Sequence, residues 1–227
     1  LPHLLNVAAL EMWNSGSMAF ALCPTLTMGA AEALAAHGSD ELKAKYLEKM
    51  ISGEWTGSMN LTEPHSGSDL GVLKTPAERR DDGSYRIFGQ KIFITWGEHD
   101  ASDNIVHLVL ARLNDAPAGV RGISLFLVPK FIPNEDGSLG ARNDAYCHSL
   151  EHKLGIHGSP TCTMIFGDGK FGDEKGAVGW LIGEEGRGLN CMFTMMNNAR
   201  LAVGMQGVAI CEAATQKAVE YAKERTQ

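Results

Sequence analysis

A loop rich in serine, threonine and glycine contains the residues best suited to hold an anionic ligand. It runs from Gly57 to Gly71 with the sequence GSMNLTEPHSGSDLG. Small residues let backbone N–H groups approach a ligand closely, and successive N–H groups can cradle a phosphate. The Ser and Thr hydroxyls can donate or accept further hydrogen bonds. The spacing matches neither a P-loop nor G-x-G-x-x-G, so the segment alone is more typical of a surface turn.

The thiols and imidazoles give weaker signals. An odd number of cysteines, five, is spread along the chain without a Cys-x-x-Cys pair. This pattern disfavours a disulfide framework or a zinc ribbon and indicates buried thiols in a reducing compartment, such as the cytoplasm. His148 and His152 lie four residues apart, but in a strand or loop this spacing does not bring two ligands together. We expect no metal site.

Composition excludes several classes of protein. The 227 residues carry a formal charge of −7, with 44% apolar and 21% charged residues. This balance predicts one large or two modest globular domains and disfavours binding to nucleic acid or an anionic membrane through bulk charge. No apolar run approaches the ~20 residues that span a bilayer, and no signal peptide pattern is present. The chain starts at Leu1 and stops just after a helical run, so we expect it to be part of a longer protein.

Residues 1–56 are predicted to form the end of an N-terminal helical domain. Apolar residues recur there at spacings of three and four, as an amphipathic helix requires. Pro24 is expected to interrupt the first run, and Gly38 is placed to end the second as a left-handed cap. Ser39 is a suitable N-cap for a third helix, and Gly53 is expected to end it.

Residues 57–182 are predicted to form an antiparallel, β-barrel-like middle domain. Their runs are short and rich in β-branched and aromatic residues, with Asp-Gly pairs suited to tight turns. Strands do not alternate with helices, which disfavours a doubly wound parallel sheet. Residues 183–227 return to a helical pattern and are expected to be the first helix of a C-terminal helical bundle. The fold class is therefore α+β.

Several ordered segments together resemble the acyl-CoA dehydrogenase family. LTEPHSGSD at residues 61–69 fits its (V/L)-T-E-P-x-x-G-S-D loop, and GQKIFIT at 89–95 is similar to its G-x-K-x-(W/F)-I-T strand. Residues 39–53, 153–161, 197–200 and 221–225 fit further blocks of the family. His65, Phe93 and the sequence GEHD at 97–100 resemble the longer members related to 3-methylmercaptopropionyl-CoA dehydrogenase.

The resemblance implies a flavoenzyme. Members bind FAD non-covalently and introduce an α,β double bond into an acyl-CoA, with the α proton going to a carboxylate and the β hydride to flavin N5. It also implies an electron-transfer flavoprotein or similar acceptor and a homodimer or homotetramer. The alternatives are an acyl-CoA oxidase-like enzyme, whose flavin is reoxidised by O2, and a non-catalytic module that retains the fold.

The resemblance also assigns residues. The cofactor-binding positions it implies are Met59, Asn60, Leu61, Thr62, Ser68, Phe93, Ile94, Thr95 and Arg225. The substrate-binding positions it implies are Ser68, Asn197, Asn198, Ala199 and Arg200. Arg225 would contact FAD from a neighbouring subunit, although alone it is equally typical of a solvated helix end.

The family's catalytic base is a Glu expected beyond residue 227, so no catalytic residue is assigned here, and neither Glu63 nor Glu212 is given that role. Without this base we expect the 227-residue chain alone to be inactive. We further predict that the Thr62 and Thr95 hydroxyls meet one concave surface with Ser68 at its rim. Period-2 alternation would place Phe93 and Thr95 opposite Ile94.

Overall fold

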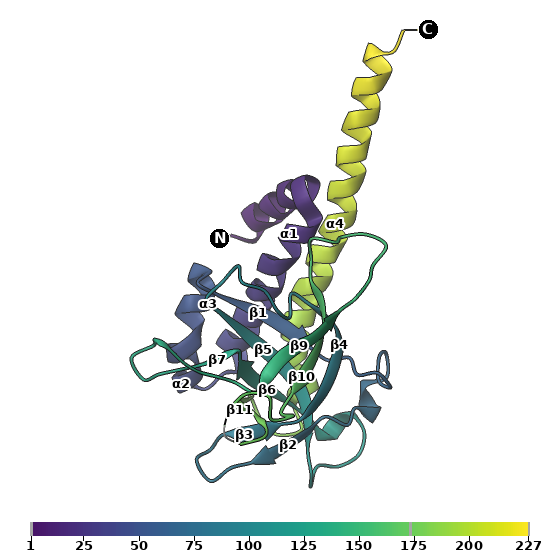
Figure 1. The fold of residues 1–227 in the computed structure, drawn as a ribbon. Coiled ribbons are helices and arrows are strands. Elements are labelled where there is room, and N and C mark those ends of the chain that lie inside the picture. The colour runs from purple at the N-terminus through teal and green to yellow at the C-terminus, as the bar shows by residue number, and fades with distance from the viewer. Residues whose placement is uncertain (1, 173, 227) are drawn as a thin grey trace.

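Helices stand at both ends of the chain and sheets lie between them in the computed structural model (Figure 1). The structure describes residues 2–172 and 174–226. Leu1, Asp173 and Gln227, which the predicted domain ranges include, lie outside the described residues. The α+β prediction is confirmed, with the strands in the middle of the chain. The domain boundaries themselves stay predictions.

The first helix, α1 (His3–His37), passes through Pro24 without a break. Its irregular residue is Ser17, where φ is −159° and ψ is 95°. The expected interruption at Pro24 is therefore wrong. Proline removes one backbone donor, but buried residues on both sides, including Ala21 and Leu26, pack this part of the helix into the core and hold it together.

Helix α1 meets the length and composition of a membrane span. The most apolar window of 18 residues within Leu4–His37 has a mean hydropathy of 1.4, although polar residues divide the apolar runs. Half of this window is buried inside the protein, as in the core helix of a globular domain. It packs along α4 (Gly188–Glu224) and against β1 (Trp55–Asn60).

A short helical stretch connects α1 to the sheets. It consists of α2 (Asp40–Leu42), a π-helical turn η1 (Lys43–Leu47) and α3 (Glu48–Ser52). The predicted caps are present, because the Leu42 N–H donates to Ser39 Oγ at 3.3 Å and Gly53 is left-handed with φ 85°. Gly38 does end α1, but its φ of −70° is not the expected left-handed value.

The main sheet has six strands in the order β1-β5-β2-β3-β11-β6, and β6 pairs back with β5. This circuit of pairings agrees with the barrel-like expectation. Its members besides β1 are β2 (Pro76–Arg79), β3 (Tyr85–Ile87), β5 (Asn104–Leu113), β6 (Ile123–Pro129) and β11 (Ala177–Ile182). The expected antiparallel pairing is wrong for two pairs, since β5 runs parallel to both β1 and β2. The chain crosses over between these strands instead of turning back in a hairpin.

A second sheet covers one side of the first. It has three strands in the order β4 (Gly89–Thr95), β10 (Thr161–Phe166) and β9 (Ala145–Leu150), all antiparallel. A small ribbon pairs β7 (Phe131–Pro133) with β8 (Leu139–Arg142). Short 3-10 turns occur at η2 (Leu70–Val72) and η3 (Val120–Gly122).

Strand β5 lies between two apolar layers, which explains its continuous apolar sequence. Leu108 and Leu110 belong to the core cluster that includes residues of α1 and α4, whereas Val109 belongs to the cluster with Met164 and Phe166 of β10. A strand buried on both faces shows no polar alternation. Strand β1, which leads into the first candidate motif, pairs along its whole length with this doubly buried strand.

Helix α4 extends well beyond the sheets, and its last turns form the tip of the molecule in Figure 1. Its first turns are buried, because Cys191, Met192 and Met195 belong to the core cluster shared with α1. Its outer part exposes a series of apolar side chains: Leu201, Val203, Val208, Ile210, Val219 and Tyr221.

Candidate functional site

The two sequence motifs lie side by side. The chain leaves β1 at Asn60 and passes Leu61 and Thr62, and the backbone N–H of Ile92 on β4 donates to the Thr62 carbonyl at 2.9 Å. The segments that contain Thr62 and Thr95 are thus joined by a backbone hydrogen bond. That their hydroxyls meet one concave surface stays a prediction.

A β-bulge shapes the strand that carries Thr95. Lys91 pairs with Met164 and Ile94 pairs with Cys162, so β4 has one more residue than β10 over this stretch. Phe93 lies in the bulge with φ 59° and is 59% exposed. A left-handed, non-glycine residue is strained and persists only where its surroundings enforce it. Ile94 is buried while Phe93 and Thr95 are more exposed. The bulge at Phe93 interrupts the period-2 alternation, so a shared strand face for Phe93 and Thr95 stays a prediction.

A buried ion pair links the two motifs below their surface. Lys91 Nζ donates to Glu63 Oε1 at 2.8 Å and to the Leu61 carbonyl at 3.0 Å, and the Lys91 and Glu63 side chains are 0% and 3% exposed. Glu63 also accepts hydrogen bonds from the backbone N–H groups of Lys74 and Thr75 at 2.7 and 3.1 Å. One carboxylate therefore ties together the end of β1, strand β4 and the segment leading to β2.

Electrostatics make Glu63 a poor base. Burial by itself raises the pKa of the Glu63 carboxyl. The Lys91 charge and the hydrogen bonds together lower it by more, so the pKa of Glu63 lies below its ordinary value. Burial lowers the pKa of Lys91 to about 8, against the attraction of Glu63. A carboxylate committed to an ammonium and two amides has no reason to accept a substrate proton. The structure thus supports withholding the catalytic role from Glu63.

The Ser/Gly loop after Glu63 is held by its own hydrogen bonds. The Ser66 hydroxyl donates to the Asp69 carbonyl at 2.7 Å, and the Gly71 N–H donates to Asp69 Oδ1 at 2.9 Å. Ser68 lies between them on the exposed side of the loop. This placement suits the ligand contact predicted for Ser68, which stays a prediction.

A neutral histidine supports β1 from the neighbouring strand. Asn60 Nδ2 donates to Ser58 Oγ at 2.9 Å, and Ser58 Oγ lies 2.7 Å from His107 Nδ1. The Ser58 hydroxyl is then free to donate its own proton to Nδ1, which places the ring proton of His107 on Nε2. Burial lowers the pKa of His107 to about 3, with Arg142 and Lys130 adding to the effect. The ring is therefore uncharged beneath the strand that carries Asn60.

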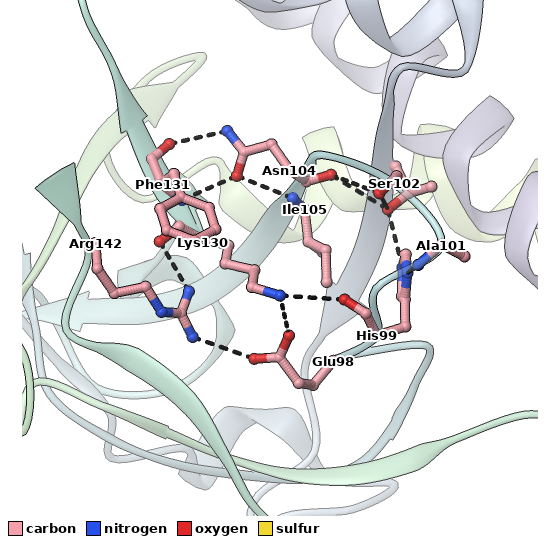
Figure 2. A network of polar contacts seen from close by, with 10 residues as sticks. Glu98, His99, Ala101, Ser102, Asn104, Ile105, Lys130, Phe131 and Arg142 are labelled. Atoms are coloured by element: carbon pink, nitrogen blue, oxygen red, sulfur yellow. Dashed lines mark hydrogen bonds and ion pairs between the residues drawn. The ribbon is translucent and has the colours of Figure 1, made fainter. Parts of the chain in front are cut away.

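A charged network fixes the turn that follows Thr95 (Figure 2). Glu98 binds Lys130 through one oxygen and Arg142 through the other, the latter at 3.1 Å, and Lys130 also donates to the His99 carbonyl at 3.1 Å. The turn is also tied to α1, because Trp96 Nε1 donates to a carbonyl of that helix at 3.2 Å. Strand β4 is thus fixed at its end as well as at its centre.

The predicted residues of α4 divide into two places. Asn197, Asn198, Ala199 and Arg200 follow the buried first turns of the helix, and Arg200 Nη1 donates to Asn197 Oδ1 at 3.1 Å. Arg225 lies just after the helix at the far tip, donates to the Tyr221 hydroxyl at 3.0 Å and is exposed. Within one chain α4 carries Arg225 away from β4. The predicted contact of Arg225 with FAD could then be made only in a neighbouring subunit, and it stays a prediction.

Sequence reasoning assigned no role to four of the residues that build this site: Glu63, Lys91, His107 and Glu98. Glu63 and Lys91 belong to the quoted motifs, so their signal was present as a Glu and a Lys inside otherwise ligand-like segments. Glu98 belongs to the quoted GEHD segment, whereas His107 had no comparable signal. Among the residues that the structure describes, no group of three His, Cys, Asp or Glu side chains could hold a metal ion.

Comparisons with known proteins agree with this geometry. The acyl-CoA dehydrogenase N-terminal domain matches residues 1–54, and the acyl-CoA dehydrogenase middle domain matches residues 58–168. The chain is 55% identical over its full length to a 3-methylmercaptopropionyl-CoA dehydrogenase from Ruegeria pomeroyi. It is 46% identical, again over its full length, to a butyryl-CoA dehydrogenase from Syntrophomonas wolfei. The chain spans 37% of each of these relatives.

A solved structure supports the fold. The butyryl-CoA dehydrogenase of Megasphaera elsdenii superposes with a TM-score of 0.77 at 30% identity. The match covers 97% of this chain and 53% of the solved one. Together the two domain matches account for most of the residues around β1, β4 and the loop between them.

Proposed function

The chain belongs to the acyl-CoA dehydrogenase family, and we propose that its protein is an FAD-dependent enzyme that introduces an α,β double bond into an acyl-CoA thioester. The observation that carries this proposal is that the two sequence motifs lie side by side in the structure. The Ile92–Thr62 backbone bond and the buried Glu63–Lys91 pair bring together the segments that the family resemblance assigns to the flavin. A non-catalytic module that retains the fold is separated from this proposal by whether the purified protein holds a flavin.

The residues present fit an isoalloxazine ring. Phe93 offers an exposed aromatic face, and the neighbouring Thr62 and Thr95 supply hydroxyls that suit the ring's polar edge. Thr62 and Thr95 would donate hydrogen bonds to the ring, and Ser68 would bind near the pyrophosphate. The further positions proposed for FAD are Met59, Asn60, Leu61, Ile94 and, from a neighbouring subunit, Arg225. When bound, the flavin supplies the acceptor for the β hydride.

This chain's own residues contribute position. The Ser58–His107 contact and the Glu98 network hold β1 and β4 rigid, so the two hydroxyls keep their spacing while substrate binds. No base is proposed among the described residues, because the buried Glu63 carboxylate is committed to Lys91. Residues Asn197 to Arg200 are proposed to line the path of the acyl-CoA.

The remaining assignments extend the same proposal. The similarity to 3-methylmercaptopropionyl-CoA dehydrogenase favours a short, thioether-containing acyl-CoA as substrate. We assign an electron-transfer flavoprotein as acceptor and a homodimer or homotetramer as the assembly. Five free cysteines favour a reducing compartment such as the cytoplasm.

The test is anaerobic reduction of the purified full-length protein, since we expect the 227-residue chain alone to be inactive. Addition of 3-methylmercaptopropionyl-CoA or butyryl-CoA should bleach the oxidised-flavin absorbance without O2. Absence of bound flavin, or no bleaching with any acyl-CoA, would refute the proposal. Rapid reoxidation on exposure to air would instead favour the oxidase-like alternative.

Thr95→Val sharpens this test, because valine keeps the shape and removes the hydroxyl. An unpaired flavin group should cost about 1–3 kcal/mol, which slows reduction by roughly 5- to 150-fold. Thr163→Val on the neighbouring strand β10 is the matched control and should leave the rate unchanged. A change of less than about twofold in Thr95→Val would reduce Thr95 to a strand residue.

A further inference from the structure

Arg112, near the end of β5, joins the Ser/Gly loop to the loop between β5 and β6. Its guanidinium donates hydrogen bonds to four backbone carbonyls. On the side of the Ser/Gly loop, Nη2 donates to Gly71 at 3.1 Å and Nε donates to Leu73 at 3.4 Å. On the other side, Nη1 donates to Pro117 at 2.6 Å and Nη2 donates to Gly119 at 2.9 Å. One side chain therefore holds two loops together.

Arg112 differs from the arginines that form ion pairs. The guanidinium groups of Arg79, Arg80, Arg86 and Arg142 each have a carboxylate oxygen within 3.7 Å. In the part of the chain that the structure describes, no ion pair includes Arg112. Its planar set of donors binds carbonyl oxygens instead, which a fork of fixed geometry can do at several points at once. The role of Arg112 is thus to connect backbone segments.

The segment that ends the Ser/Gly loop, residues 71–75, is held from two sides. Besides the side-chain contacts, the backbone N–H of Arg112 donates to the Thr75 carbonyl at 2.8 Å. From the other side, the Glu63 carboxylate accepts hydrogen bonds from two backbone N–H groups of this segment. Glu63 also begins the loop, so both ends of the loop that carries Ser68 are fixed.

The loop between β5 and β6 is built closely around the guanidinium. A Cβ added at Gly122 would lie 1.9 Å from the Pro117 carbonyl oxygen and 2.3 Å from Arg112 Nη1, so only glycine fits there. Gly119, whose carbonyl accepts from Nη2, is left-handed with φ 77°. Glycine adopts this conformation without the cost that a side chain would add. Two glycines therefore let the backbone approach Arg112.

We propose that Arg112 is a positioning residue that holds the Ser/Gly loop in the shape that receives the FAD pyrophosphate at Ser68. This inference rests on the proposed function, which assigns the pyrophosphate to that loop. Arg112 acts through the Gly71 and Leu73 carbonyls. A loop that is ordered before binding loses less conformational entropy when the ligand binds, so the affinity is higher. Removal of the guanidinium should loosen the loop and weaken FAD binding.

The first measurement is hydrogen–deuterium exchange on the full-length protein after FAD has been removed. In Arg112→Gln we expect faster exchange in residues 64–73 than in wild type, because the loop has lost its contacts to the neighbouring loop. Exchange in residues 161–166, on β10, should stay unchanged. This readout does not depend on bound FAD or on activity, and a general loss of stability would raise exchange in both segments.

The second measurement is the Kd for FAD, followed by flavin fluorescence as the same FAD-free proteins are titrated. The Kd should rise about tenfold or more in Arg112→Gln. Arg112→Lys keeps the charge, but its single nitrogen cannot span four carbonyls in two loops, so the Kd should stay at least about threefold above wild type. Arg121→Gln removes the same charge from an exposed position on η3 and is the matched control, which should bind FAD as wild type does.

The outcomes separate this inference from the proposed function. Wild-type protein that binds no FAD would refute the proposed function itself. The inference alone is overturned if wild type binds FAD and Arg112→Gln binds it with a Kd within about twofold of wild type. It is also overturned if exchange in residues 64–73 does not rise, or if Arg112→Lys restores the wild-type Kd, because the charge and not the fork would then be responsible.

Discussion

Two ion-pair clusters of this molecule have similar contacts and opposite surroundings. Lys91 and Glu63 are 0% and 3% exposed beneath the candidate site. Arg79 on β2 forms hydrogen bonds of 2.6–3.1 Å to Glu185 and Asp115, but these three side chains are 47%, 39% and 68% exposed. By contact geometry alone the exposed cluster is the richer one.

Burial reverses that ranking. Water screens the charges of the exposed cluster and remains available to any side chain that loses its partner. Neither applies to Glu63 and Lys91, because each would keep an uncompensated charge inside the protein if the other were removed. The comparison indicates that the candidate site depends on polar contacts inside the sheets, while the surface cluster is dispensable. The Glu98 network, with side chains 17–27% exposed, lies between these extremes.

Breaking the buried pair should give the largest effect. Lys91→Met keeps the length of the side chain but leaves the Glu63 carboxylate without its cation. We expect the free energy of unfolding to fall by about 3–5 kcal/mol, measured by urea denaturation of the purified protein. A loss below about 1 kcal/mol would place the pair with the surface cluster.

A double variant tests whether the charge itself is the cause. Adding Glu63→Gln to Lys91→Met removes the orphaned charge and keeps an oxygen that can accept a backbone hydrogen bond. The double variant should therefore be more stable than Lys91→Met alone. Equal or lower stability would indicate lost packing instead of an unpaired charge.

The Glu98 network should give an intermediate effect. Glu98→Gln leaves the ammonium of Lys130 and the guanidinium of Arg142 facing each other, and we expect a loss of about 1–3 kcal/mol in the free energy of unfolding. Glu135→Gln, at an exposed position, is the matched control and should change nothing. If both variants have the same free energy of unfolding, the network in Figure 2 contributes no more to stability than an ordinary surface charge.

The buried histidine should appear in the pH dependence. The pKa of His107 is about 3 in the folded protein and 6.5 ordinarily, so the unfolded chain binds the extra proton first. Its stabilising effect is complete above about pH 6.5 and is lost as the pH falls toward 3. His107→Asn, which keeps an acceptor for Ser58, should flatten the loss of stability between about pH 6.5 and pH 4. His157→Asn, at an exposed position, should leave the wild-type slope; an equally steep slope in His107→Asn would contradict the prediction.

The exposed cluster should give the smallest effect. Arg79→Gln removes the contacts to Glu185 and Asp115, yet all three side chains then return to water. We expect no measurable change in the denaturation midpoint at ordinary salt. At low salt the free energy of unfolding should fall by no more than a few tenths of a kcal/mol, as for a typical surface pair. A loss comparable to that of Lys91→Met would overturn the comparison.

Much of the fold could be predicted because local signals agreed with the tertiary structure. The helix caps at Ser39 and Gly53 follow from the chemistry of single residues, and the β character of residues 57–182 follows from composition. The continuous path of α1 through Pro24 could not be predicted, because distant residues pack against the helix there. The parallel pairing of β5 with β1 depends equally on how the chain crosses over.

The sequence by itself determined the family to which the chain belongs and which segments we expect to bind a ligand, because the T-E-P and K-x-F-I-T motifs are short, contiguous and ordered. Only the tertiary structure decided that Glu63 neutralises Lys91, that Asn60 and Ser58 rest on a neutral His107, and that Phe93 lies in a bulge. Each of these facts joins residues from different strands, and register and burial arise only when the sheets close around a common core. The physical reason is that the side chains of an unfolded chain stay in water and pay no desolvation cost. Once the core forms, that cost determines which charges and hydrogen bonds matter for stability.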